Sequence, residues 1–381
     1  SHHLKVVGFR NLIKFMKNKI TLNILIGLLL TTSVSCLANP LYSSTKEQVA
    51  MDNTIKLQKL DLTTKWDKTF KQSEKVVHSK VTFANRYGIT LAADLYLPKV
   101  DSKEATPKFP AIVVMGPYGA VKEQVSGMYA QTMAEKGYLT LAVDPSFFGE
   151  SGGEPRYLAS PEISTEDFSA AIDYLLTRTD VAHDKIGILG ICGFWGFAIN
   201  AAASDPRIKA TVTSTMYDMS RVNAFGYNDV NDEAIRAKLR QSYADQRTKD
   251  YKQGYYDLNG GVVDPLPKDA PLFVQDYYAY YKTKLGYHPR SPNSNHGLTI
   301  TTSIAFMNMP INTYAGEIKS AVLMVHGSKA HSRYFSEDTF KRLKGSNKEL
   351  LIIEGANHTD LYYKTDVIPF AQIAAFYQKY L

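Results

Sequence analysis

The sequence predicts an α/β protein built on a mostly parallel, doubly wound sheet. Short apolar runs of strand length alternate along the chain with longer segments of helical spacing, and each parallel crossover needs such a helix. A glycine-flanked cysteine joins one of these strands directly to a helix. A long tyrosine-rich segment interrupts the alternation once, which indicates an inserted cap.

The N-terminal region has the pattern of an export signal. A basic stretch that begins at Met16 precedes the apolar run 20–30, which is too short to span a membrane. Cleavage after Ala38 would release the mature chain. The alternative is a lipobox ending at Cys36 and a lipid-anchored protein, although Ser33 stands where a Leu-like residue is expected. We expect a periplasmic or secreted bacterial protein with no stable membrane insertion after signal removal.

The net charge of +7 at pH 7 overstates the charge of the exported chain. Residues 1–38 hold five basic residues and no acidic residue, so about +2 remains after cleavage. This small charge does not suggest nucleic-acid binding. Cys192 would be the one cysteine left, so no internal disulfide can form. Chemistry at the thiol is one reason to retain it in an oxidising compartment.

Apolar runs bounded by turn residues predict the sheet, and periodic runs between them predict the helices. Strands are predicted over 76–85, 89–96, 111–115, 139–144, 185–191, 209–214, 321–326 and 349–353. Helices are predicted over 121–136, 163–176, 197–203 and 368–380. The order of these elements favours parallel pairing with helices on both faces.

The tyrosine-rich insert lies between the sixth and seventh predicted strands and has helical stretches near 233–252 and 271–284. We expect a cap at about 218–315 over the catalytic end of the sheet. Two or three of its tyrosines would line a pocket, while the others pack the cap. The chain then divides into a tag remnant and signal peptide (1–38), a flexible segment (39–74) and one domain with its cap (75–381).

Cys192 stands between a predicted strand and a predicted helix. A turn from strand to helix within two residues forces its central residue into a strained conformation, and Gly190 and Gly193 give the turn room. The pattern is that of a nucleophile elbow, G-x-S-x-G, with sulfur for oxygen and Phe194 at the last glycine position. The helix N-terminus is expected to favour the thiolate. The alternative is a buried cysteine that packs as a small apolar side chain.

His358 is the predicted base for this nucleophile. It follows the last predicted strand and precedes the closing helix, and imidazole accepts protons near neutral pH. The chain order, nucleophile first and histidine last, also fits a nucleophile-elbow enzyme. The alternative is a solvent-facing loop histidine.

The acid that would orient His358 is harder to find. A carboxylate usually follows the strand before the last, but Ser328 and its neighbours there include none. Asp218, which follows the strand 209–214 at the same end of the sheet, is the predicted acid. A helix N-cap or a salt bridge within the cap is the alternative role for Asp218, and a Cys-His dyad can work without an acid.

Backbone N–H groups are expected to hold the oxyanion that forms in acyl transfer. One is the N–H of Gly193, the residue after the nucleophile. The other comes from the loop 116–120, where Tyr118 is the predicted donor because Pro117 has no N–H.

Several runs together resemble the bacterial dienelactone-hydrolase-like branch of the α/β-hydrolases. They are Gly-Pro-Tyr-Gly-Ala-Val-Lys-Glu-Gln, Asp-Pro-Ser-Phe-Phe-Gly-Glu-Ser-Gly-Gly, Gly-Ile-Cys-Gly, Met-Tyr-Asp-Met-Ser-Arg, Tyr-His-Pro-Arg and Ala-His-Ser-Arg-Tyr-Phe-Ser-Glu. The resemblance implies a Cys or Ser nucleophile, a cap and ester or related acyl hydrolysis without a metal. The chain differs from the family at Gly116, Trp195 and Ser328, and Trp195 is expected to crowd the elbow.

The leading hypothesis is an exported hydrolase that cleaves a carboxylic ester, lactone or thioester. Cys192 attacks, His358 moves the proton, Asp218 steadies His358, and Gly193 and Tyr118 hold the oxyanion. A small-molecule acyl substrate is expected, with no cofactor and no metal. A peptidase or acyltransferase on the same fold is one alternative, and a non-catalytic binding protein on a hydrolase scaffold is another.

Overall fold

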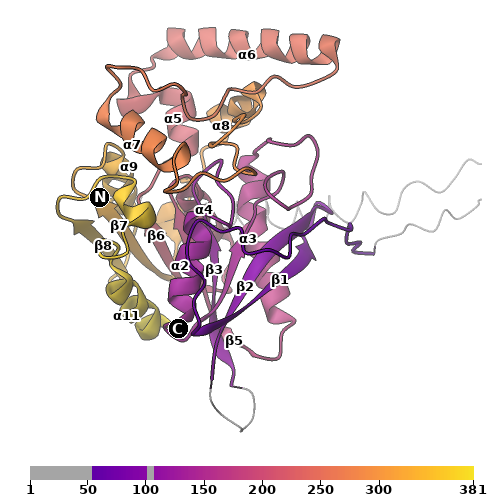
Figure 1. The fold of residues 1–381 in the computed structure, drawn as a ribbon. Helices are drawn as coiled ribbons and strands as arrows, with labels where there is room; N and C mark the ends of the chain where they lie inside the picture. The colour runs from indigo at the N-terminus through magenta and orange to yellow at the C-terminus, as the bar shows by residue number, and fades with distance from the viewer. Residues whose placement is uncertain (1–53, 101–106) are drawn as a thin grey trace, which may run out of the picture. The chain divides into compact units, whose positions relative to one another are not determined.

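The structure is a computed structural model that describes residues 54–100 and 107–381 (Figure 1). The predicted signal peptide, its cleavage site and Cys36 lie outside the described residues. Within the described residues, no helix combines the length and the apolar character needed to cross a membrane.

An eight-stranded sheet with the strand order β1-β2-β4-β3-β5-β6-β7-β8 forms the centre of the domain. β2 pairs antiparallel with β1 and with β4, and all other neighbouring strands are parallel. The strands are β1 (Val76–Ala84), β2 (Thr90–Pro98), β3 (Phe109–Met115), β4 (Leu139–Val143), β5 (Val181–Ile191), β6 (Ile208–Ser214), β7 (Ala321–Gly327) and β8 (Lys348–Ile353). The predicted fold class is confirmed.

Helices cover both faces of the sheet and enclose a separate apolar core on each. One face carries α3 (Pro161–Leu176), α4 (Phe194–Ser204) and α9 (Arg333–Phe340); the other carries α2 (Val125–Ala134), α10 (Asp360–Tyr363) and α11 (Phe370–Tyr380). Trp195 is fully buried in the first core, whereas Cys192 belongs to the second. The Trp195 ring therefore packs in the core opposite to that of Cys192, and only its backbone lies against the elbow, 2.9 Å from where a Cβ of Gly190 would be.

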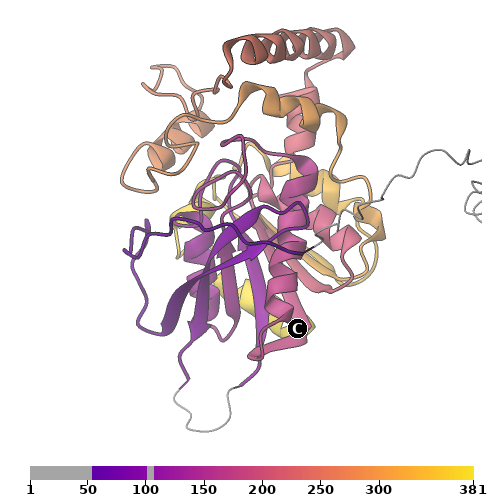
Figure 2. The same cartoon turned by 90° about the vertical axis from the view of Figure 1, so that its right-hand side faces the viewer.

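The cap lies between β6 and β7, as predicted, and contains α5 (Met219–Phe225), α6 (Glu233–Gln253), α7 (Leu272–Tyr281) and α8 (Ser303–Asn308). Figures 1 and 2 show these helices stacked beyond one end of the sheet, with α6 across the far side of the cap. β5, β6, β7 and β8 run parallel and end on this side. The loops that carry the predicted site residues therefore open toward the cap.

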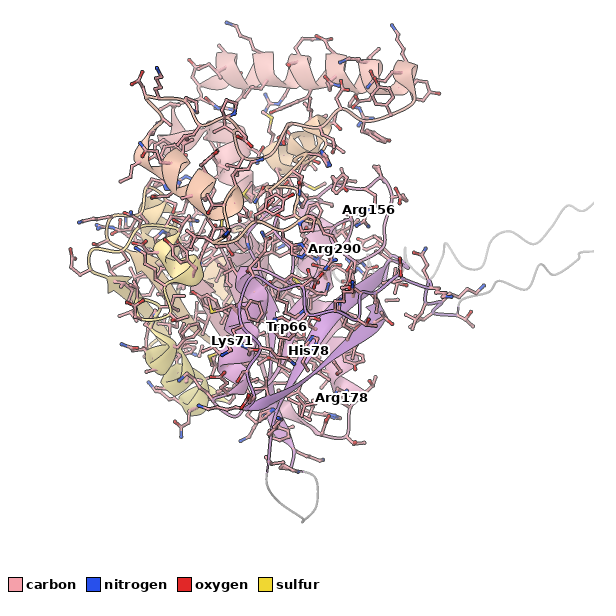
Figure 3. All side chains as sticks on the ribbon, in the orientation of Figure 1. Trp66, Lys71, His78, Arg156, Arg178 and Arg290 are labelled. Carbon is pink, nitrogen blue, oxygen red and sulfur yellow. The ribbon has the colours of Figure 1, made fainter. Side chains whose placement is uncertain are left out.

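Residues 55–74, part of the segment predicted to be flexible, make contacts with the domain. The Thr69 N–H donates to the Glu123 carbonyl (2.9 Å), and Lys68 Nζ lies 2.6 Å from Asp94. The Trp66 ring meets His78 edge to face, with centroids 5.2 Å apart (Figure 3). The side chains of Asp67, Lys68 and Thr69 thus have partners in the domain, so the polar composition does not indicate a free tail.

A buried ion network joins this segment, the domain and the cap. Lys122 is completely buried, and its Nζ lies 2.7 Å from a carboxylate oxygen of each of Glu123, Asp144 and Glu150. Arg290, from the cap, lies 2.7 Å from Glu123 (Figure 3). Burial disfavours the Lys122 ammonium, but the surrounding carboxylates outweigh burial and raise its pKa. The network therefore depends on one cation at its centre.

Replacing Lys122 with Met is expected to lower the free energy of unfolding by about 3–5 kcal/mol, because buried Asp144 loses its counter-charge. Glu123 and Glu150 keep only Arg290 and Lys80. The carboxylates would then have pKa values raised above those of the unfolded chain, so the deficit should shrink as pH falls and they protonate. Urea denaturation at several pH values measures the difference in the free energy of unfolding between the parent and the variant. Lys185→Met, at an exposed position of β5, is the control, and equal stability of both variants would refute the account.

Candidate active site

Cys192 forms a sharp turn from β5 into α4. Its φ angle is 54°, in the left-handed region that non-glycine residues rarely adopt. A Cβ at Gly190 would lie 2.6 Å from the carbonyl oxygen of Phe194, so the strand and the helix approach too closely for a side chain there. The backbone of Cys192 is held by neighbouring strand ends, since its N–H donates to the Ser214 carbonyl at 3.0 Å. The strained elbow expected from the sequence is present.

Three polar groups, two backbone N–H groups and one hydroxyl, lie close to the sulfur of Cys192. The backbone N–H groups of Gly193 and Tyr118 and the hydroxyl of Tyr362 act on this sulfur and lower the pKa of its thiol. Burial raises the pKa of the Cys192 thiol to about 11, more than these donors lower it. The sulfur is therefore a neutral thiol at neutral pH, which corrects the expectation that the helix N-terminus yields a thiolate.

The loop that carries Tyr118 is pinned by the cap. Asn293 donates its side-chain amide to the Tyr118 carbonyl (2.7 Å), and its backbone N–H donates to the Gly119 carbonyl (3.0 Å). Gly119 has φ 78°, and a Cβ there would lie 2.3 Å from the Asn293 side chain. The N–H pair of Gly193 and Tyr118 is thus held by both the sheet and the cap.

His358 lies in the loop between β8 and α10 and is 2% exposed. Thr215 donates its hydroxyl to the His358 carbonyl (3.2 Å), which fixes the loop to the end of β6. The imidazole Nε2 lies 3.1 Å from the hydroxyl oxygen of Tyr362, and this hydroxyl also lowers the pKa of the Cys192 thiol. The structure therefore brings Cys192 and His358 together through Tyr362.

A hydroxyl occupies the position behind His358 where the sequence analysis expects a carboxylate. His358 Nδ1 lies 2.5 Å from Ser332 Oγ, which lies 3.0 Å from His326 Nε2. His326 Nδ1 in turn lies 2.6 Å from Ser336 Oγ. Burial lowers the pKa of His326 to about 3 and that of His358 well below its usual value. The two imidazoles and the two serine hydroxyls in this row of contacts are therefore uncharged at neutral pH.

Asp218 does not reach His358, which corrects its predicted role. It is the N-cap of α5 and accepts hydrogen bonds from the Arg221 N–H (2.9 Å) and the Ser220 hydroxyl (2.7 Å). Its other oxygen accepts from the Asn312 side chain at 2.7 Å. The helix that begins just after β6 needs a cap, and the carboxylate is used there.

Ser328, where the family resemblance suggests a carboxylate, also points elsewhere. Its hydroxyl accepts a hydrogen bond from the Gly355 N–H at 2.8 Å. Ser332 and Tyr362 are the partners of His358 that the sequence analysis missed. Their only signals are a serine six residues after His326 and a tyrosine four residues after His358.

Aromatic and imidazole side chains surround Cys192 and His358. The rings of Tyr277, from α7, and of His331 have centroids 5.4 Å and 5.2 Å from that of His358. Burial raises the pKa values of Tyr217, Tyr277 and Tyr362 and lowers that of His331 to about 4. The surroundings of the sulfur are thus polar but uncharged.

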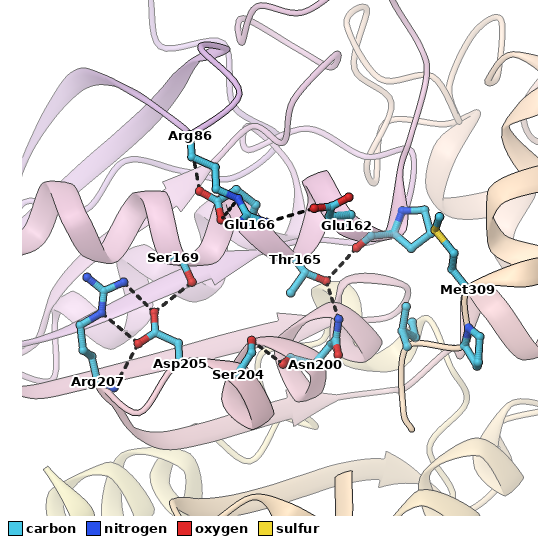
Figure 4. A pocket seen from close by; sticks show the side chains of 13 residues that line it. Arg86, Glu162, Thr165, Glu166, Ser169, Asn200, Ser204, Asp205, Arg207 and Met309 are labelled. Carbon is cyan, nitrogen blue, oxygen red and sulfur yellow. Dashed lines mark hydrogen bonds and ion pairs between the residues drawn. The ribbon is translucent and has the colours of Figure 1, made fainter. Parts of the chain in front are cut away.

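A cluster of buried carboxylates and a surface pocket are two other candidate ligand sites. Among the described residues, Glu123, Asp144 and Glu150 have carboxylate oxygens within 4.8 Å of one another, but the Lys122 ammonium already fills the space between them. A surface pocket of about 590 Å³ lies between α3 and α4 (Figure 4). Its charged groups pair with one another, as Arg207 does with Asp205 at 2.7 Å, and no candidate catalytic residue lines it.

The pKa of Cys192 has a direct consequence for its alkylation. In a Cys36→Ser background, the rate of reaction with iodoacetamide should keep rising up to about pH 11, because only the thiolate reacts. Cys192→Ser in the same background is the control and should not be labelled. A rate that levels off below pH 8 would show a preformed thiolate instead.

Asp218→Asn tests whether this carboxylate acts on His358. Asparagine caps helices about as well as aspartate, so kcat on a p-nitrophenyl ester should change by less than about threefold. In a serine triad, the corresponding change of the acid costs about 10⁴-fold in kcat. A loss of kcat of that size would show that Asp218 is the acid that orients His358.

Residues 87–360 match the X-Pro dipeptidyl-peptidase family (S15). The uncharacterized protein PA2218 of Pseudomonas aeruginosa is 53% identical over 330 residues, which cover 84% of this chain and 86% of that protein. Its crystal structure has a TM-score of 0.82 and covers 85% of this chain and 100% of that chain.

Two further proteins are similar over part or most of the chain. The thiohydrolase aneE of Aspergillus aculeatus is 31% identical over 227 residues, which cover 60% of this chain and 62% of that protein. The α/β hydrolase GrgF of Penicillium sp. sh18 has a TM-score of 0.66 at 18% identity, covering 80% of this chain and 99% of that chain. GrgF shows the shared fold alone.

These comparisons confirm the α/β-hydrolase superfamily, while the dienelactone-hydrolase-like branch stays a prediction. The order of the sheet, the elbow at β5 and the cap after β6 agree with that superfamily. With the S15 match spanning residues 87–360, the chain belongs to the X-Pro dipeptidyl-peptidase (S15) family of α/β-hydrolases.

Proposed function

We propose that this α/β-hydrolase cleaves an uncharged acyl substrate, a carboxylic ester, lactone or thioester, through a cysteinyl acyl-enzyme. Cys192 is the nucleophile and His358 the base. The N–H groups of Gly193 and Tyr118 stabilise the oxyanion. We also propose export to the periplasm or the outside of a bacterial cell, as the sequence of residues 1–38 indicates.

The observation that carries this proposal is the pair of N–H groups that converge on the sulfur of Cys192. An acyl carbon bonded to the sulfur puts its oxygen close to the same two donors, where they stabilise charge that develops in the transition state. Gly193 has to be glycine there, because a Cβ would lie 2.5 Å from the Tyr118 Cβ. A structural cysteine has no need of such a converging pair.

The uncharged surroundings favour a neutral substrate. Among the described residues, the groups that shift the pKa values of Cys192 and His358 include no carboxylate and no ammonium. Tyrosine rings offer apolar surface with an occasional hydroxyl, which suits an acyl chain or aromatic acid. The similarity to a thiohydrolase supports thioesters within this class.

A peptidase is the second candidate, because the family match is to the X-Pro dipeptidyl-peptidases. Such an enzyme has to bind the free ammonium group of its peptide, which calls for a carboxylate near the nucleophile. Asp218 caps α5, and in the described part of the chain no carboxylate is among the groups that shift the pKa of Cys192. This difference favours ester or thioester hydrolysis over dipeptide release.

A substrate panel separates the candidates. We expect the protein to hydrolyse p-nitrophenyl esters and acyl thioesters faster than alanyl-prolyl p-nitroanilide, and Cys192→Ala to lower kcat by at least about 10⁴-fold. Cys36→Ser is the matched control and should keep the parent rate. Faster cleavage of the anilide would favour the peptidase, and equal rates for parent and Cys192→Ala would reject the nucleophile.

A further inference from the structure

A single hydroxyl stands between the thiol and the imidazole. Tyr362 Oη lies 3.1 Å from His358 Nε2, and Tyr362 is buried in the same core as Cys192, whose thiol pKa its hydroxyl lowers. Tyr362 lies on the short helix α10, which is anchored because Tyr129 donates its hydroxyl to the Leu361 carbonyl at 2.7 Å. With Tyr362 1% exposed, this hydroxyl has no solvent route of its own.

Behind His358, the contacts continue through neutral groups only. Ser332 Oγ lies between His358 Nδ1 (2.5 Å) and His326 Nε2 (3.0 Å), and Ser336 Oγ lies 2.6 Å from His326 Nδ1. Ser332, His326 and Ser336 are each 0% exposed. This arrangement occupies the place of the carboxylate that usually orients a catalytic histidine.

We propose that Tyr362 is a catalytic residue that passes the proton from Cys192 to His358, and that Ser332 and His326 are positioning residues that replace the triad acid. The inference rests on the proposed function, since it assigns further residues to the same reaction. We call Tyr362, His358, Ser332 and His326 the relay.

One set of hydrogen-bond directions makes the resting relay consistent. The Cys192 thiol donates to Tyr362 Oη, and the Tyr362 hydroxyl donates to His358 Nε2. His358 Nδ1–H then donates to Ser332 Oγ, and the Ser332 hydroxyl donates to His326 Nε2. His326 Nδ1–H donates to a hydroxyl lone pair of Ser336. Each hydroxyl donates once, and His358 has its lone pair on the side of the thiol.

The proton balance of the first step follows. The sulfur–carbon bond forms while the carbonyl electron pair moves to oxygen, which the N–H groups of Gly193 and Tyr118 receive. The thiol proton passes to Tyr362 Oη as the Tyr362 proton passes to His358 Nε2, leaving an imidazolium. Collapse of the tetrahedral intermediate breaks the bond to the leaving group, which takes a proton back from His358 through Tyr362. Water then attacks the acyl carbon and its proton passes through Tyr362 to His358; the sulfur–carbon bond breaks, and the proton returns through Tyr362 to the sulfur of Cys192.

The titratable neighbours of the relay are uncharged, including Tyr281, which also acts on Tyr362. The titratable groups that face Cys192 and His358 from the other elements are Tyr217, Tyr277, Tyr281 and His331. Burial raises the pKa values of these tyrosines and lowers that of His331, so all stay neutral at the pH of the reaction. A neutral relay suits a thiol, which is far more acidic than a serine hydroxyl and needs a weaker base.

Tyr362→Phe removes only the hydroxyl. In the Cys36→Ser background, we expect kcat on a p-nitrophenyl ester to fall at least about a hundredfold, and the alkylation rate of Cys192 at pH 8.5 to fall about tenfold. Tyr280→Phe is the matched control, because Tyr280 is equally buried and packs on Tyr362 (centroids 5.2 Å apart), while Thr69 and Val125, not Cys192 or His358, act on its hydroxyl. Equal values for the two variants in both assays would overturn the role of Tyr362.

Ser332→Ala tests the positioning half of the relay. We expect kcat to fall about tenfold and the ¹⁵N shifts of the His358 imidazole to change from a single Nδ1–H tautomer to a mixture. Ser328→Ala, in the same loop but bonded to Gly355, should leave both values unchanged. A parent protein with His358 in the Nε2–H form would overturn the relay without any variant, because Tyr362 could not then donate to it.

These outcomes separate the relay from the proposed function. If the parent hydrolyses no acyl substrate, the function fails, whereas alkylation and the ¹⁵N shifts still decide whether Tyr362 and Ser332 act on Cys192 and His358. If turnover depends on Cys192 but not on the hydroxyl of Tyr362, the function stands and the relay is rejected.

Discussion

The turn at Cys192 is the constraint on which the rest of the site depends. A cysteine at φ 54° costs about 1–3 kcal/mol in backbone strain, and the burial of α4 against the sheet offsets it. This strained turn places the sulfur of Cys192 beside the N–H groups of Gly193 and Tyr118. Gly190 makes the turn possible, since no side chain fits between the strand and the helix there.

The molecule separates its buried charges from its candidate chemistry. The network around Lys122 joins the segment 55–74, the domain and the cap through Arg290, so it fixes the cap over the sheet. The site itself contains thiol, hydroxyl and imidazole groups that burial keeps neutral. A charged ligand entering such a site would lose its hydration without gaining a counter-charge, which is the physical reason to expect an uncharged acyl substrate.

The sequence predicted the parts of the site that depend on local pattern. Cys192 and Gly193 lie on one strand–turn–helix unit, and His358 follows a strand end, so their common place at one edge of the sheet follows from topology. Ser332 and Tyr362 could not be found in this way, because their side chains meet His358 only after separate loops pack together. Asp218 was misassigned because a carboxylate between a strand and a helix fits a triad acid and an N-cap equally well.

The central claim is that Cys192 carries the acyl group during turnover. The most direct measurement mixes the Cys36→Ser protein with p-nitrophenyl acetate, quenches the reaction in acid within its first turnover and locates the acetyl group by peptide mass spectrometry. The account predicts one acetyl group on the peptide that contains Cys192, released by hydroxylamine as a thioester is. Acetylation confined to any other residue, or turnover with no acetylated peptide, would contradict it.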